Sequence, residues 1–331
     1  MRFPMSDLKY SSEIESDLAR YRDSTNLVIA SQLFDDPARR DAFTTLYSLM
    51  RMIDDTVDAV FERTVTFEER QSIAASLKNW ESLILSAYSG HPHPDLARKL
   101  SEILRHYAIP QVLWENFFRA MWMDFNGTVF ETIDRFEQYC DGASVAATTI
   151  YLLLIGAPDS VSGENHTDRF DYSSAGRYLG IWAYSVHILR DLREDVLTGD
   201  TGRYLIPDEI LHRYELSRAQ LRESAASGKV SSSLLNMVRE FWLLGQHHGK
   251  LGMRMVDTLA ETLPLSRQKV LCIIISIYSH MSEAIYRLGW DVIRNDLRQA
   301  VSDREDLIQR ILTASTWSQL RQFWVSDSIV L

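Results

Sequence analysis

Long apolar runs are missing from this chain of 331 residues. The longest uninterrupted ones, residues 150–155 and 270–275, are far shorter than the roughly 20 residues that a membrane-spanning helix needs. The N-terminal segment Met1–Asp7 also has no apolar core of the kind found in a secretory signal. We therefore expect a cytoplasmic protein that contacts a membrane at most peripherally.

Cysteine is scarce as well. The chain has two, Cys140 and Cys272, each within an apolar segment and neither at a spacing typical of a metal or redox site. A reduced compartment is the simplest interpretation, and a single disulfide between the two stays open at this point. Positive charge is also in deficit: the net charge is −10 and the acids are spread along the chain, so no nucleic-acid partner is expected.

Proline is rare, and strand patterns are missing. The eight prolines fall between stretches in which apolar residues recur at helical spacing, as at Leu96, Leu100 and Ile103. No sustained alternation of apolar and polar residues indicates a β-strand. With an apolar fraction of 46%, the sequence predicts one all-α domain over residues 1–331, of which residues 1–20 could be flexible.

What the chain does have is two clusters of aspartate at helical spacing. In the first, Tyr47, Arg51, Asp54 or Asp55, and Asp58 fall on one stripe of a predicted helix. Apolar residues surround these acids more closely than on a solvated acidic face, so we expect the carboxylates to face the interior. An ordinary pattern of surface salt bridges is the alternative for this cluster taken alone.

The second cluster repeats the arrangement. Tyr184, His187, Asp191 and Asp195 form one stripe, and Arg190 lies beside the acids. Burying several carboxylates together is costly unless cations neutralise them. Oxygen ligands on two facing helices favour a hard divalent cation, so the two clusters together predict magnesium and a phosphorylated substrate.

A magnesium-bound diphosphate explains the cationic and aromatic residues near the clusters. Arg51, Arg190 and Arg203 could donate charge-assisted hydrogen bonds to it. Loss of diphosphate from an allylic carbon leaves a carbocation, which aromatic faces stabilise without trapping it. The candidate aromatic residues, each of which could equally be plain core, are Tyr47, Tyr139, Tyr184 and Trp182.

The segment after the second cluster contains Gly199, Gly202, Arg203 and Pro207. Glycines and an arginine next to a cation site are typical of a mobile flap that closes over the diphosphate. A plain helix-terminating loop would contain the same residues. Two pairs of histidines, His91 with His93 and His247 with His248, have no third ligand at useful spacing and are expected at the surface.

Six strings of residues resemble the squalene and phytoene synthase family, over Ser24 to Arg298. They are Ala30-Ser31-Gln-Leu-Phe34, Tyr47-xxx-Arg51-xx-Asp54-Asp55-xx-Asp58, Phe136-Glu-Gln-Tyr139-Cys140, Ile188-Leu-Arg190-Asp191-xx-Glu194-Asp195, Gly202-Arg203-xxx-Pro207 and Gly289-Trp290-Asp291-Val292. Each is modest alone, but six in order at family-like spacing are specific. The resemblance implies an isoprenoid-synthase helical bundle with a central cavity, and magnesium-dependent ionisation of an allylic prenyl diphosphate.

The resemblance and the residue patterns together define the expected site. The residues expected to act in catalysis are Asp54, Asp58, Asp191, Asp195, Tyr47, Tyr139 and His187. Those expected to bind substrate are Arg51, Arg190, Arg203, Tyr184, Val145, Thr148 and Asn26. The expected metal ligands are Asp54, Asp55, Asp58, Asp191, Asp195 and His187.

Several positions depart from the family pattern. His187 stands where the family has an asparagine ligand, and imidazole is a poor ligand for magnesium. Tyr184 replaces a glutamine, and Val145 and Thr148 replace glycines, which predicts a narrower tunnel. Asn26 replaces a serine near the start. The ionisation residues are intact while the pocket walls are altered, which leaves the second substrate more open than the first.

We therefore predict a divergent member of this family that couples two prenyl diphosphates head to head through a cyclopropyl intermediate. One alternative is transfer of the prenyl group to a non-isoprenoid acceptor such as a small aromatic, with His187 as base or orienting group. A terpene cyclase and a non-enzymatic binding protein rank lower. A reduction step would use NADPH, for which the sequence has no dedicated glycine-rich fold.

Overall fold

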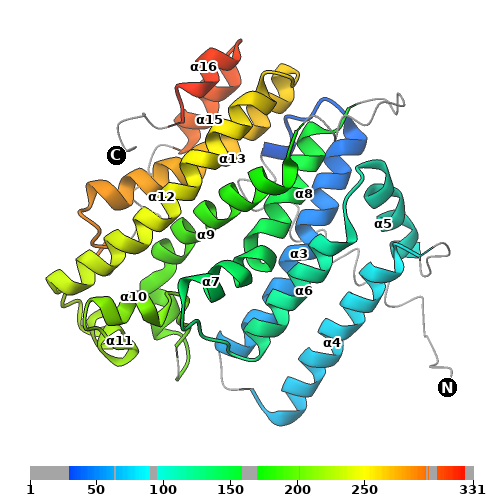
Figure 1. The fold of residues 1–331 in the computed structure, drawn as a ribbon. Coiled ribbons are helices and arrows are strands. Elements are labelled where there is room, and N and C mark those ends of the chain that lie inside the picture. Colours follow the sequence, from blue (N-terminus) through cyan, green and yellow to red (C-terminus); the bar gives the residue numbers. More distant parts are fainter. Residues whose placement is uncertain are drawn as a thin grey trace.

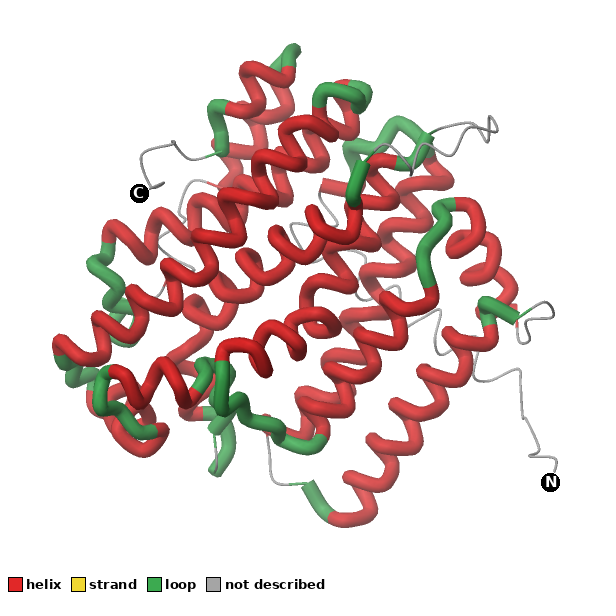
Figure 2. The backbone as a smooth tube through the Cα atoms, in the orientation of Figure 1, coloured by secondary structure: helices red, strands yellow, loops and turns green. Residues whose placement is uncertain are grey.

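The computed structural model describes residues 30–62, 65–89, 95–158, 170–200, 202–295, 297 and 304–324. Within these residues the backbone forms helices, turns and loops but no β-strand, which confirms the all-α prediction (Figure 2). The helices are α3 (Pro37–Glu62), α4 (Phe67–Ser86), α5 (Asp95–His106), α6 (Gln111–Phe125), α7 (Ile133–Cys140), the π-helix η1 (Asp141–Val145), α8 (Ala146–Gly156), α9 (Tyr172–Leu197), α10 (Asp208–Arg213), α11 (Arg218–Ser227), α12 (Ser232–Ala260), α13 (Leu265–Arg287), α15 (Arg304–Thr313) and α16 (Trp317–Arg321).

Helix starts follow from the local sequence. The side chains of Thr66, Asp171 and Ser231 each accept a hydrogen bond from the backbone N–H three residues further on. Pro37 is the first residue of α3 and Pro264 precedes α13, positions at which the missing N–H is not needed. The expected placement of prolines at the ends of helical segments is confirmed at these positions.

The central element is α9, which carries the second aspartate cluster. Its most extensive partner is α12, which lies alongside it (Figure 1). A Cβ atom at Gly245, Gly249 or Gly252 of α12 would lie 2.7 to 2.8 Å from a side-chain atom of α9, so only glycine permits this close approach. The first cluster is on α3, which packs against α4, α6 and α8.

The helices α7, η1 and α8 form one continuous stretch of 24 residues, Ile133–Gly156. Its π-helical turn brings Gly142 against α6, where a Cβ atom would lie 2.0 Å from the carbonyl oxygen of Asn116. By length and composition this stretch could cross a membrane, but 61% of its apolar window is buried inside the protein, as in a core helix.

Two buried arginines close the C-terminal end of α8. Arg39 Nη2 donates to the carbonyl oxygen of Ala157 at 2.9 Å, and Arg267 Nη1 donates to the same oxygen at 2.5 Å. Arg39 also donates to the carbonyl of Leu154. These bonds satisfy carbonyl groups that a helix end leaves without partners, and they hold α8 to α3 and α13.

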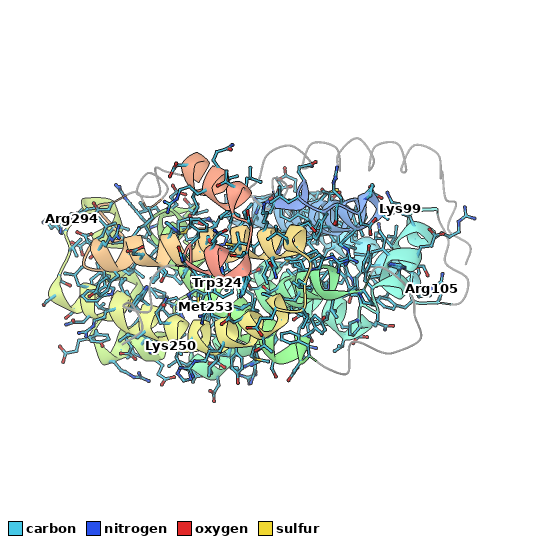
Figure 3. The ribbon with its side chains drawn as sticks, turned by 90° about the horizontal axis from the view of Figure 1, so that it is seen from above. Lys99, Arg105, Lys250, Met253, Arg294 and Trp324 are labelled. Atoms are coloured by element: carbon cyan, nitrogen blue, oxygen red, sulfur yellow. The ribbon has the colours of Figure 1, made fainter. Side chains whose placement is uncertain are left out.

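Beyond α13, the helices α15 and α16 pack on its surface. Seen from above, the bundle is an elongated block (Figure 3). Lys99 and Arg105 of α5 lie at one end of this block, and Arg294, which follows α13, lies at the other (Figure 3).

The two cysteines are both buried and free, so they do not form the disulfide that the sequence left open. Burial raises the pKa of Cys140 well above its ordinary value and that of Cys272 to about 12. Thiols held in this neutral form are unreactive core side chains.

The two pairs of histidines that the sequence predicts at the surface have different environments. His247 is exposed, as predicted, but the prediction is wrong for His248, which is 8% exposed. His248 faces α7 rather than solvent, and its Nε2 lies 3.2 Å from Glu137 Oε1. His91 and His93 lie outside the described residues.

Candidate active site

A cavity of about 530 Å³ lies between α3, α6, η1, α8, α9 and α13, a size typical of ligand pockets. One end is polar, with three arginines, Arg51, Arg190 and Arg203, and six acids, Asp54, Asp58, Asp124, Asp191, Glu194 and Asp195. The remaining walls are largely apolar and include Leu152, Ile155, Leu179, Leu271, Ile274 and Ile275. Acids from both aspartate clusters predicted from the sequence therefore line the same cavity, although Asp55 of the first cluster is not one of the lining residues.

The carboxylates of α3 form a compact group. One oxygen each from Asp54, Asp55 and Asp58 lie within 4.8 Å of one another. Arg51 reaches two of these acids, with Nη1 at 3.2 Å from Asp54 Oδ2 and Nη2 at 2.7 Å from Asp55 Oδ1. Burial, together with the nearby charge of Asp58, raises the pKa of Asp54 to about 7. A compact group of three carboxylates that share the one guanidinium of Arg51 fits a hard divalent cation such as Mg²⁺.

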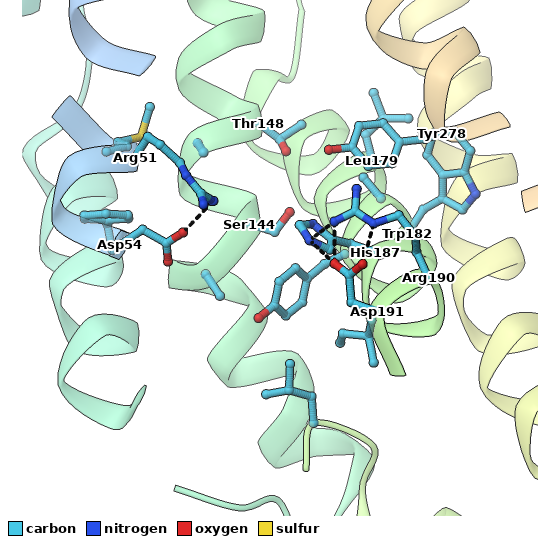
Figure 4. Close-up of a pocket in the computed structure, with 18 of the residues that line it drawn as sticks. Arg51, Asp54, Ser144, Thr148, Leu179, Trp182, His187, Arg190, Asp191 and Tyr278 are labelled. Carbon is cyan, nitrogen blue, oxygen red and sulfur yellow. Dashed lines mark hydrogen bonds and ion pairs between the residues drawn. The ribbon is translucent and has the colours of Figure 1, made fainter. Parts of the chain in front are cut away.

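On α9, the carboxylate of Asp191 is already paired (Figure 4). Arg190 Nε donates to Asp191 Oδ1 at 2.8 Å, Arg190 Nη2 contacts Oδ2, and His187 Nε2 lies 2.9 Å from Oδ2. Burial alone would raise the pKa of Asp191, but the hydrogen bonds from Arg190 and His187 outweigh it and hold that pKa well below its usual range. Burial lowers the pKa of His187.

Asp195, one turn further along α9, has a different environment from Asp191. Burial raises the pKa of Asp195 to about 7, with Asp191 and Asp58 acting in the same direction and Arg203 opposing them. Asp58 thus influences a carboxylate on each of the two helices, which places both clusters at one site.

Arg203 connects the clusters from the loop after α9. Its Nη1 lies 3.2 Å from Asp58 Oδ1 and its Nη2 lies 3.2 Å from Asp124 Oδ1. Its backbone N–H donates to the carbonyl of Asp195 at 2.8 Å, and its guanidinium lies 5.2 Å from the centre of the Phe61 ring. The arginine of the predicted flap is therefore bound to the acids at the polar end of the cavity.

Asp124 is a functional candidate that the sequence analysis missed. It is 5% exposed, and Tyr139 Oη lies 2.9 Å from both of its carboxylate oxygens and 2.9 Å from Tyr184 Oη. Burial raises the pKa of Asp124, and Arg203 opposes that change. The signal was present in the sequence, because Asp124 follows Met121 on the apolar face of α6, where an unpartnered charge would be costly.

A sequence model described as squalene/phytoene synthase matches residues 21–305. The chain belongs to the squalene/phytoene synthase family. The phytoene synthases of Mycobacterium bovis and Mycobacterium tuberculosis are each 24% identical to it over 221 residues, or 67% of this chain and 66% of the relative. The presqualene diphosphate synthase of Zymomonas mobilis is 28% identical over 178 residues, or 54% of each chain. The chain thus spans just under two thirds of the mycobacterial relatives.

Solved structures share the squalene/phytoene synthase fold. A squalene synthase from Alicyclobacillus acidocaldarius has a TM-score of 0.62 at 16% identity and covers 86% of this chain and 96% of its own. A dehydrosqualene synthase in complex with a ligand has a TM-score of 0.65 at 15% identity and covers 91% and 98%. The predicted family and the predicted all-α fold are confirmed.

The residues that depart from the squalene/phytoene synthase pattern lie in different places. Thr148 and Tyr184 line the cavity, as expected. Val145 does not narrow it, because its side chain is buried against α9, where its Cα lies 2.7 Å from the Cβ position of Gly180. Asn26 lies outside the described residues.

Aromatic side chains form much of the cavity wall. The four aromatic residues singled out from the sequence, Tyr47, Tyr139, Tyr184 and Trp182, all line it. Sequence reasoning missed Tyr151 of α8 and Tyr278 of α13, which also line it. Both lie in strongly apolar segments, where a tyrosine looks like one more core residue.

Proposed function

We propose that this chain is a Mg²⁺-dependent isoprenyl transferase that ionises an allylic prenyl diphosphate and couples it head to head with a second prenyl diphosphate. One observation carries the proposal: a single cavity joins a polar end of carboxylates and arginines to apolar, aromatic walls. Such a cavity suits a substrate with a diphosphate head and a hydrocarbon tail. The relatives named phytoene synthase and presqualene diphosphate synthase support head-to-head coupling.

The compact carboxylates Asp54, Asp55 and Asp58, with Asp195 opposite them, would hold the Mg²⁺. When bound, the cation supplies Lewis-acid stabilisation of the charge on the leaving diphosphate. The carboxyl groups of Asp54 and Asp195 must lose their protons to bind a cation.

The arginines would receive the diphosphate as its bond breaks. The C–O bond cleaves with its electron pair going to the diphosphate, and Arg51, Arg190 and Arg203 stabilise that charge through charge-assisted hydrogen bonds. The family resemblance implies that Asp191 is a metal ligand. Its carboxylate is paired with Arg190 and would orient that arginine toward the diphosphate, and His187 contacts the same carboxylate.

The allylic cation would be sheltered by ring faces rather than by nucleophiles. Tyr47, Trp182 and Tyr139 line the cavity and can stabilise positive charge through their rings. The double bond of the second substrate supplies the electron pair for the new carbon–carbon bond, and a proton is then lost. The hydroxyl group of Tyr139, which donates to Asp124, is the proposed relay for that proton.

The test is an assay of the purified protein with Mg²⁺ and, separately, dimethylallyl, geranyl, farnesyl and geranylgeranyl diphosphate, with and without NADPH. Released diphosphate is measured, and organic extracts are analysed by mass spectrometry. We expect a C30 or C40 product from one donor. Donor binding without any coupled product would overturn head-to-head coupling.

A specific observation favours a second candidate, transfer to a polar non-isoprenoid acceptor. Thr148, Tyr151 and Tyr278 line the cavity, and the described ranges contain no hydrogen-bond partner for their hydroxyl groups. Figure 4 shows Tyr278 and Thr148 projecting into the same part of the cavity. A hydrocarbon tail leaves these hydroxyl groups unsatisfied, whereas the O–H or N–H of a small aromatic acceptor would pair with them.

The two candidates differ in what Tyr278→Phe and Thr148→Val should do. If the acceptor is polar, each variant should lower transfer to it by about tenfold, because one hydrogen bond is lost. Diphosphate release from the donor alone should be unchanged. Unchanged transfer in both variants would remove the second candidate.

We further propose that the chain acts as one domain in the cytoplasm, with at most peripheral membrane contact for delivery of an apolar product. Burial of most of the stretch Ile133–Gly156 supports this placement. Fractionation of cells into soluble and membrane material would test it.

A further inference from the structure

One wall of the cavity depends on a glycine in another helix. Trp182 of α9 is 2% exposed and lines the cavity. Behind it lies Gly249 of α12, whose Cβ position would be 2.7 Å from Cδ1, 2.9 Å from Cγ and 3.0 Å from Nε1 of the indole. These distances are shorter than van der Waals contact, so any side chain at position 249 must displace the rigid ring.

The cavity is the space into which the ring would move. In the part of the chain that the structure describes, α12 contributes no residue to the cavity lining, so it supports α9 from behind. In front, the Trp182 ring lies 6.1 Å from the ring of Tyr278, at an angle of 59° (Figure 4). An indole displaced from α12 would therefore occupy volume that the substrate tail uses.

We propose that Gly249 is a positioning residue for specificity: it lets the indole of Trp182 lie against α12 and so sets how long a prenyl chain the cavity accepts. This inference rests on the proposed function, since it assumes that the apolar part of the cavity holds a prenyl tail. The diphosphate end is formed by other residues and should not respond to position 249.

The same helix offers a matched control. Gly245, one turn before Gly249, also packs against α9, and its Cβ position would lie 2.8 Å from Cβ of Ser185. Ser185 does not line the cavity. The nearest approach of the added Cβ to α9 is therefore similar in Gly245→Ala and Gly249→Ala, at 2.8 and 2.7 Å. The further close contacts of Gly249→Ala, at 2.9 and 3.0 Å, are with the ring of Trp182, so only this variant moves a wall of the cavity.

The experiment measures binding by calorimetry with Mg²⁺, using uncleavable thiodiphosphate analogues of the geranyl, farnesyl and geranylgeranyl donors, and inorganic pyrophosphate. We expect Gly249→Ala to weaken binding of the longest analogue relative to the shortest by about tenfold, which is the lower end of the effect of one methylene group in an apolar pocket. Pyrophosphate affinity should be unchanged. Gly245→Ala should leave the ratio of the affinities for the long and short analogues the same as in the wild type.

A double-substitution cycle separates this role from a general loss of packing. In a Trp182→Leu background, Gly249→Ala should no longer change the ratio, because no indole remains to be displaced. The inference would be overturned if the ratio of long-analogue to short-analogue affinity were the same in the Gly249→Ala and Gly245→Ala variants. It would also be overturned if Gly249→Ala changed that ratio fully in the Trp182→Leu background.

The outcomes also separate this inference from the proposed function. If no analogue binds the wild-type protein, the proposed function fails. If the analogues bind but the ratio does not move, only the role of Gly249 fails. Should Gly249→Ala not fold, as judged by circular dichroism, Trp182→Leu alone is decisive: it should favour the longest analogue, and an unchanged ratio would overturn the inference.

Discussion

The two aspartate clusters look alike in sequence but have different charge environments in the structure. On α3, a single arginine reaches Asp54 and Asp55, and the pKa of Asp54 is raised to about 7. On α9, Asp191 is bound by Arg190 and His187, and its pKa is held below its usual range. The single guanidinium of Arg51 is shared by two carboxylates on α3, whereas the one carboxylate of Asp191 on α9 is contacted by both Arg190 and His187.

This difference shows that acids at helical spacing do not by themselves define a metal site. What matters is which donors share the helix face and how many oxygens they leave available. The α3 group leaves three oxygens within 4.8 Å of one another. On α9, Asp195 is the acid whose pKa is raised, by burial and by the nearby negative charges of Asp191 and of Asp58 on the other helix. We therefore expect α3 to contribute most of the metal affinity and α9 most of the diphosphate orientation.

The largest expected effect comes from removing an α3 carboxylate. Asp54→Asn should lower the rate of diphosphate release by about 10³-fold, because a lost metal ligand costs several kcal/mol of transition-state stabilisation. It should also weaken the binding of Mn²⁺, which is measured in a titration that follows free Mn²⁺ by electron paramagnetic resonance. Asp191→Asn should slow diphosphate release as well, yet leave Mn²⁺ affinity closer to that of the wild type.

If Asp191→Asn weakened Mn²⁺ binding as much as Asp54→Asn does, the assignment of most of the metal affinity to α3 would be wrong. Asp191 would then release Arg190 and His187 to ligate the cation. Asn is isosteric with Asp, and far-ultraviolet circular dichroism of both variants checks that the helices are intact.

A smaller effect is expected from Arg203, which joins the clusters. Arg203→Gln leaves the buried Asp124 and the partly buried Asp58 without their shared cation, which should cost about 3 kcal/mol in the free energy of unfolding. Diphosphate release should fall by about 10²-fold, the usual cost of losing one charge-stabilising donor. Urea denaturation and a phosphate-release assay measure the two quantities.

Arg51→Gln is the matched control for stability, because the Arg51 side chain is 44% exposed while that of Arg203 is 17% exposed. An exposed ion pair contributes less than about 1 kcal/mol. Equal losses of stability in the two variants would contradict the assignment of Arg203 as the buried connection.

The pH dependence of stability should have one sign for Asp54 and Asp195 and the opposite sign for Asp191. Asp54 and Asp195 have raised pKa values near 7, so between pH of about 4 and 7 the folded state binds more protons than the unfolded state. Their contribution to stability therefore falls as pH rises through this window. Asp191 has a lowered pKa, so its contribution is present at neutral pH and is lost as pH falls below about 4.

Thermal unfolding of the metal-free protein from pH 3 to pH 8 tests this smallest effect. In the Asp54→Asn variant, the decline in thermal stability between pH 5 and 7 should be shallower than in the wild type. Mg²⁺ should stabilise the wild type more at pH 8 than at pH 6, because the carboxylate ligands of the cation must be deprotonated. A wild-type stability that rises steadily from pH 5 to 8 without metal would contradict the raised pKa values.

Much of the fold and part of the site could be predicted from the sequence. Periodic apolar residues and proline positions predicted helices, because one turn of a helix is a local property. The acids of α3 and α9 could be placed on interior faces for the same reason. The prediction for His248 was wrong, since its burial depends on a contact with Glu137, a residue far away in the chain.

Other site residues could not be assigned because their roles depend on partners from distant segments. Asp124 is held by Arg203 and Tyr139, which come from elements that follow it in the chain. Val145 was expected in the cavity wall, but the π-helical turn that ends at this residue and the closeness of Gly180 direct its side chain against α9.

The sequence by itself determined that this chain is helical, that two carboxylate stripes face inward and that it resembles one family, since spacing along a helix fixes which side chains share a face. Only the tertiary structure decided which carboxylates remain unpaired and which aromatic rings line the cavity. Ion pairing and steric exclusion depend on distances of a few ångströms between separate helices, and the packing of those helices sets these distances.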